Sequence, residues 1–139
     1  MDTILLTKKI KQLEESLAEL KDLCREEVSE ILSNYRGYRT AERLFQLIVD
    51  TCVDINIHLI REKTGQVPDD LESTFIALGE AGILDPTFAV KIAPVVGLRN
   101  RIVHRYDTLD RRTFIETVKK EQADFDTYLE KITALVKNK

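Results

Sequence analysis

The stretch from Glu42 to Ile60 reads ERLFQLIVDTCVDINIHLI and carries apolar side chains on almost every face of a helix. A surface helix needs only one apolar stripe, so a helix that is apolar nearly all round must be covered by other elements on most sides. We therefore expect a central helix over about Tyr38 to Thr64, enclosed by the other helices of an all-α, antiparallel bundle.

Two long amphipathic segments flank the central helix in the sequence. Apolar residues three or four positions apart predict one helix over about Thr3 to Ser33 and another over about Arg111 to Lys137. The spacing in the first segment also fits a coiled coil, but the central helix needs a covering partner, which favours a bundle. Asn and Gly residues between Asn34 and Gly37 predict the turn that separates the first two helices.

Two shorter segments lie between the central helix and the last one. An aspartate cap predicts a third helix over about Asp70 to Ala81. Asp85 followed by Pro86 predicts a fourth helix, which runs toward His104 and is kinked by Pro94. The sequence thus predicts about five helices in a single helical domain that spans residues 1–139.

The composition narrows the class of protein. The chain has 139 residues, of which 43% are hydrophobic and 32% are charged, as in an ordered domain with its own core. Its net charge of −3 argues against broad affinity for nucleic acid, so any RNA contact must be local. Cys24 and Cys52 fall on apolar helical positions, which favours reduced thiols and a cytoplasmic location. We expect no signal peptide and no membrane association.

Side chains suited to chemistry gather in one segment, GLRNRIVHRYDTLD from Gly97 to Asp110. An arginine fork binds a phosphate through paired N–H donors, and a histidine can accept or donate a proton near neutral pH. Arg99 and His104 therefore supply a minimal set of groups for phosphodiester cleavage without a metal or a cofactor. The alternative is an arginine-rich helix end at which His104 caps backbone carbonyls.

A second polar series lies within the apolar central helix. Asp50, Asp54 and His58 recur every four residues and therefore line one edge of that helix. These residues could hold a metal pair, but two carboxylates and one imidazole fall short of a convincing zinc ligand set. The favoured interpretation is that they are polar residues with partners across a helix or subunit interface.

The segment Arg99, Asn100, three residues, His104, one residue and Tyr106 resembles the R-N-x3-H-x-Y signature of the HEPN superfamily. Its flanks GLRN and VHRYD are similar to those of the HepT-like ribonuclease toxins, which are paired with a minimal nucleotidyltransferase antitoxin. The resemblance implies that Arg99 and His104 are catalytic, that Asn100 supports them, and that Tyr106 accepts AMP from the antitoxin.

The resemblance extends to the central helix, whose Asp54 and His58 are similar to the family's Asp-x3-His. On this basis we expect Asp54 to orient Arg99. We also expect Arg101 and Arg105, which flank the motif, to contact RNA.

Helix geometry bears on how such a site is assembled. Residues five apart on a continuous helix differ by about 140° around its axis, so Arg99 and His104 cannot both face one phosphate from one chain. Either the helix opens near His104, or two chains share the site in a two-fold dimer, which the resemblance also implies. The predicted function is a metal-independent endoribonuclease toxin. The alternatives are a noncatalytic helical partner of a nucleotidyltransferase and a purely structural dimer.

Overall fold

The computed structural model describes residues 3–104 and 110–138, and within these ranges the chain forms seven helices and no strand. They are α1 (Thr3–Leu23), α2 (Val28–Ser33), α3 (Tyr35–Lys63), α4 (Glu72–Glu80), α5 (Pro86–Ile92), α6 (Val95–His104) and α7 (Arg111–Lys137). The predicted all-α class is confirmed. None of these helices is both long and apolar enough to cross a membrane.

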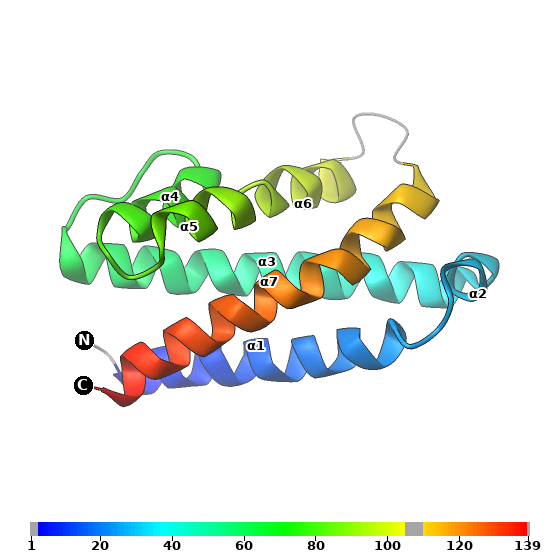
Figure 1. Ribbon diagram of the computed structural model, residues 1–139, viewed down its shortest axis with the longest axis horizontal. Helices are drawn as coiled ribbons and strands as arrows, with labels where there is room; N and C mark the ends of the chain where they lie inside the picture. The colour runs from blue at the N-terminus through cyan, green and yellow to red at the C-terminus, as the bar shows by residue number, and fades with distance from the viewer. Residues whose placement is uncertain (1–2, 105–109, 139) are drawn as a thin grey trace.

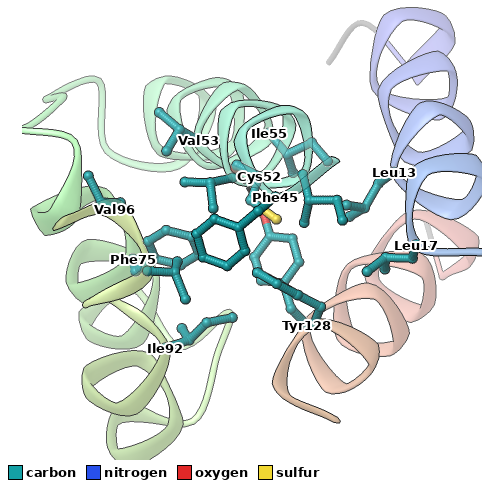
Figure 2. Packing of buried hydrophobic residues seen from close by; sticks show 14 of the residues in the cluster. Leu13, Leu17, Phe45, Cys52, Val53, Ile55, Phe75, Ile92, Val96 and Tyr128 are labelled. Atoms are coloured by element: carbon teal, nitrogen blue, oxygen red, sulfur yellow. Dashed lines mark hydrogen bonds between the residues drawn. The ribbon is translucent and has the colours of Figure 1, made fainter. Parts of the chain in front are cut away.

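Helix α3 is the central element, as its apolar pattern predicts. It runs the length of the molecule, with α1 along one side, α4 to α6 along the other, and α7 crossing it (Figure 1). Figure 2 shows side chains from these helices meeting at α3, among them Leu13 and Leu17 of α1, Phe75 of α4 and Tyr128 of α7 around Phe45 of α3. All five of these side chains are buried.

A buried polar network ties three helices together within this apolar core. The Tyr128 hydroxyl of α7 donates a hydrogen bond to Asn56 Oδ1 of α3 at 2.6 Å. Asn56 Nδ2 in turn donates to Thr74 Oγ1 of α4 at 3.1 Å. Asn56 and Thr74 are fully buried, so each needs its partner to offset the lost hydration. The network therefore fixes the register of α3 against α4 and α7.

The first predicted helix is wrong in its length, because it breaks into α1 and α2 between Cys24 and Glu27. Lys119 Nζ of α7 donates to the Glu26 carbonyl oxygen at 2.6 Å, a long-range contact that uses a carbonyl at the break. The turn expected over Asn34 to Gly37 is also shorter than predicted. Asn34 alone separates the helices, and its side chain accepts from the Arg36 backbone N–H at 3.0 Å as the cap of α3.

The fourth predicted helix is two helices, which raises the number above the expected five. The chain leaves α5 after Ile92 and enters α6 at Val95, with Pro94 at the break. The break is consistent with proline, which lacks the N–H that a continuous helix requires. The cap prediction is confirmed, since Asp85 accepts from the Phe88 backbone N–H at 3.1 Å. This break allows α6 to lie along α3 and bring Arg99 to it.

Candidate active site

Arg99 forms a forked contact with the central helix. Its Nε donates to Asp50 Oδ1 at 2.7 Å, and its Nη2 donates to Asp50 Oδ2 at 3.3 Å. Val95, Val96 and Ile102 are buried on α6 and hold that helix against the core, which sets Arg99 beside α3. A forked arginine–carboxylate pair fixes the plane of the guanidinium as well as its position.

Asn100 completes the environment of the guanidinium. Its Oδ1 accepts a hydrogen bond from Arg99 Nη1 at 3.2 Å. Three of the five N–H donors of Arg99 are thus engaged by Asp50 and Asn100, which leaves two for another acceptor. The Arg99 side chain is 19% exposed, so those donors lie at the edge of the protein and not in its core.

The expectation that Asp54 orients Arg99 is wrong, because Asp50 takes that place. Asp54 instead pairs with Lys9 Nζ of α1 at 3.1 Å. The two aspartates are one helical turn apart on α3, and α6 meets that helix at the earlier turn. The recurrence of Asp every four residues could have identified both positions as candidates. It could not have distinguished them, because the choice depends on how α6 crosses α3.

The polar edge of α3 consists of residues with separate partners. Asp50 pairs with α6 and Asp54 with α1, which confirms that these two are satisfied across helix interfaces. His58 Nε2 lies 4.0 Å from Glu62 Oε2 on the same helix. Within residues 3–104 and 110–138, no group of three or more His, Cys, Asp or Glu side chains is placed to hold a metal ion.

His104 is the last residue of α6 and is exposed. Because α6 remains helical from Val95 through His104, its direction around the helix axis differs from that of Arg99 by about 140°. The structure therefore brings Asp50 and Asn100 to Arg99 within one chain, but it leaves His104 on another side of α6. A phosphate bound at Arg99 would need a histidine from elsewhere.

Arg101 lies on the other side of α6 from Arg99, where it lines a groove of about 460 Å³ between α6 and α7. Leu98 and Phe114 form part of the same lining. Arg101 is therefore not part of the cluster around Asp50. Arg105 and Tyr106 lie outside the residues that the structure describes.

The same groove contains an acidic group that the sequence analysis missed. Burial, followed by the neighbouring Asp124 carboxylate, raises the pKa of Glu121 to about 7. Asp124 itself pairs with Lys91 Nζ of α5 at 3.3 Å. The spacing of Glu121 and Asp124 on α7 places them on one face, which is the signal by which the pair could have been found.

Comparison with known proteins identifies the family. The family model described as "Ribonuclease HepT-like" matches residues 13–132. The tRNA nuclease HepT of Aphanizomenon flos-aquae is 30% identical over 135 residues, which cover 96% of this chain and 91% of that protein. The mRNA nuclease HepT of Shewanella oneidensis is 26% identical over 89 residues, which cover 64% of this chain and 67% of that protein.

Solved structures share the fold. A tri-AMPylated HEPN toxin from Shewanella oneidensis, solved in complex with its MNT antitoxin, superposes with a TM-score of 0.86 at 20% identity. The match covers 96% of this chain and 98% of that one. A toxin–antitoxin structure with AMP-PNP gives a TM-score of 0.83 at 19% identity, covering 93% and 97% of the two chains. The extent of the family match, together with this fold, shows that the chain belongs to the ribonuclease HepT-like family.

Proposed function

We propose that this chain is an endoribonuclease toxin that cleaves RNA without a metal ion, with Arg99 and His104 as its catalytic residues. The observation that carries the proposal is the hold of Asp50 and Asn100 on Arg99. It fixes the guanidinium at the protein edge while two N–H donors remain for a phosphate. Membership of a ribonuclease family supports the same activity.

The role proposed for Arg99 is geometric as well as electrostatic. Asp50 offsets its formal charge, so the guanidinium contributes directed N–H donors more than net positive charge. Donors fixed in advance toward the phosphate stabilise the charge that develops in the pentacoordinate transition state. Lys carries the same charge but has no planar fork, so it cannot contact Asp50 and a phosphate in the same way.

The proposed site lies between two chains. A two-fold dimer that apposes the two α6 helices brings Arg99 of one chain and His104 of the other to one cleft, which the 140° separation on one helix prevents within a chain. Val103, an apolar residue of α6 that is 38% exposed, supports an interface on this helix.

The proposed chemistry starts from the ribose 2′-hydroxyl of RNA. One His104 imidazole accepts the 2′-hydroxyl proton as the 2′-oxygen bonds to phosphorus, and the bond from phosphorus to the 5′-oxygen breaks. The second His104 donates a proton to that leaving oxygen. The products are a 2′,3′-cyclic phosphate and a 5′-hydroxyl, and DNA is not cleaved because it has no 2′-hydroxyl.

The proposed partner is a nucleotidyltransferase antitoxin that transfers AMP to Tyr106. A relative with the same fold is a tri-AMPylated toxin in complex with an MNT antitoxin, which supports this assignment. Tyr106 follows His104 by two residues, so an added nucleotide would place its phosphate near the arginines that we assign to RNA, Arg101 and Arg105. A phosphate there would compete with substrate for the same N–H donors.

The experiment is RNA cleavage in EDTA by the wild-type chain and by three variants. His104→Ala and Arg99→Lys are expected to lose most of the activity. Lys131→Ala, an exposed position on α7, is expected to keep it and serves as the matched control. Activity that requires added Mg²⁺ or Mn²⁺, or that survives in His104→Ala, would contradict the proposal. No cleavage by the wild type with or without divalent ions would favour a noncatalytic partner of the nucleotidyltransferase.

A further inference from the structure

A second cavity, of about 340 Å³, lies between the start of α1 and the later half of α3. Its aliphatic lining comes from Leu5 and Leu6 of α1 and from Ile55 and Ile57 of α3. Leu6 and Ile55 are buried, whereas Leu5 is 44% exposed and leaves the cavity open at one side. The cavity therefore offers an apolar floor that solvent, and a small ligand, can reach.

Cationic side chains surround this floor. Lys9 and Arg61 both line the cavity, and Asp54 is the carboxylate that lines it with them. Lys9 Nζ contacts Asp54 at 3.1 Å, which offsets that carboxylate and leaves the charge of Arg61 as the local excess. An anionic group is the ligand that this excess attracts.

His58 adds an unpartnered polar atom to the same cavity. Its Nε2 is buried and has no hydrogen-bond partner among the residues that the structure describes. The nearest carboxylate oxygen is Glu62 Oε2 at 4.0 Å, which is too far for a hydrogen bond. A buried polar atom of this kind is costly unless a ligand or solvent satisfies it.

We propose that this cavity binds a small aliphatic monocarboxylate. The carboxylate accepts hydrogen bonds from Arg61 and His58, and the hydrocarbon chain packs on Leu5, Ile55 and Ile57. Among the described residues of the lining there is no Phe, Tyr or Trp, so the cavity has no aromatic surface on which a nucleobase would stack. A volume near the lower limit of ordinary ligand sites suits a body of about ten heavy atoms.

This site is independent of the proposed RNA cleavage. Its nearest link to Arg99 is that Asp54 is one helical turn from Asp50 on α3. The test can therefore read the cavity directly, without any measurement of nuclease activity. The whole chain contains only two histidines, His58 and His104, so their imidazole Cε1–H signals are simple to resolve.

The experiment is a titration of the full-length protein with octanoate, followed by the histidine signals in two-dimensional NMR. We expect a saturable shift of the His58 signal with a Kd of about 1 mM, and a small change at His104. Octan-1-ol, which has the same chain without the charge, is expected to bind at least tenfold more weakly. A non-saturating response, equal shifts at both histidines, or equal binding of octan-1-ol would overturn the proposal.

Charge reversal at the rim provides the second arm. Arg61 is exposed, so Arg61→Glu is expected to fold and to weaken octanoate binding at least tenfold. Lys131→Glu makes the same charge change at an exposed position on α7 and is expected to leave binding unchanged. Equal weakening in the two variants would show a general effect of net charge and would overturn the assignment of Arg61.

Discussion

Arg99 of α6 and Asp50 of α3 are joined by two contacts, Nε to Oδ1 at 2.7 Å and Nη2 to Oδ2 at 3.3 Å. They are 49 residues apart in the chain, so only the packing of α6 on α3 brings them together. The pair links the central helix of the bundle to the R-N-x3-H-x-Y segment. In the proposed enzyme, Asp50 is a positioning residue that acts through Arg99.

Asp50→Asn is expected to lower kcat for RNA cleavage about 10- to 100-fold, since a small displacement of a catalytic group has effects of this size. The thermal unfolding temperature should change little, because the pair is partly exposed. Asp54→Asn is the matched control, one turn away and paired with Lys9, and should keep a kcat close to that of the wild type. Equal losses in the two variants, or equal losses of stability, would remove the positioning role from Asp50.

Subunit mixing tests whether two chains build each site. Arg99→Ala and His104→Ala are each expected to be inactive alone, and their mixture should regain part of the wild-type activity in mixed dimers. The reason is that one cleft of a mixed dimer contains an intact Arg99 from one chain and an intact His104 from the other. Sedimentation should give twice the mass of one chain. An active monomer, or a mixture that remains inactive while mixed dimers form, would exclude the shared cleft.

Tyr106 is expected to be the site of regulation by the partner. Incubation with a cognate nucleotidyltransferase and ATP should add one or more AMP units to Tyr106, as measured by peptide mass spectrometry, and should abolish RNA cleavage. The added phosphate should occupy donors that would otherwise bind RNA. Tyr106→Phe should remain active and should escape silencing. Modification at another residue, or silencing of Tyr106→Phe by nucleotide transfer, contradicts this assignment.

Much of the fold could be predicted from local signals. The apolar surface of the Glu42 to Ile60 stretch identified the central helix, and Asp85 with Pro86 identified the start of α5. The break between α1 and α2 was missed because the apolar spacing continues through it. A contact from Lys119, which is 93 residues away, uses a carbonyl at that break.

The candidate site could be predicted only in part for the same reason. Arg99 and Asn100 are adjacent in the sequence, and their contact follows from a local pattern. The choice of Asp50 over Asp54 depends on the crossing of α6 over α3, which no spacing within either helix encodes. Glu121 was missed because its pKa is raised mainly by burial, and burial is a property of the packed fold.

Glu121 predicts a pH dependence of stability. Its pKa is about 7 in the folded chain against an ordinary value of 4.5, so the folded state holds a proton that the unfolded state has lost between these two values. The free energy of unfolding should therefore be highest below about pH 4.5 as far as this group is concerned, and should fall as pH rises toward 7. Urea unfolding across this range measures the slope.

Glu121→Gln removes the titrating group and should flatten this part of the pH profile. Glu130→Gln, exposed on the same helix, is the matched control and should keep the wild-type slope. A wild-type profile in which the contribution removed by Glu121→Gln increases with pH would contradict the raised pKa.

The most direct measurement of the proposed function is the chemistry of the RNA ends. A 5′-labelled RNA is cleaved by the wild-type chain in EDTA, and the products are analysed for their terminal groups. The 2′-hydroxyl mechanism predicts 2′,3′-cyclic phosphate or 3′-phosphate ends opposite 5′-hydroxyl ends, with none of them formed by His104→Ala. Products with 3′-hydroxyl and 5′-phosphate ends would contradict it.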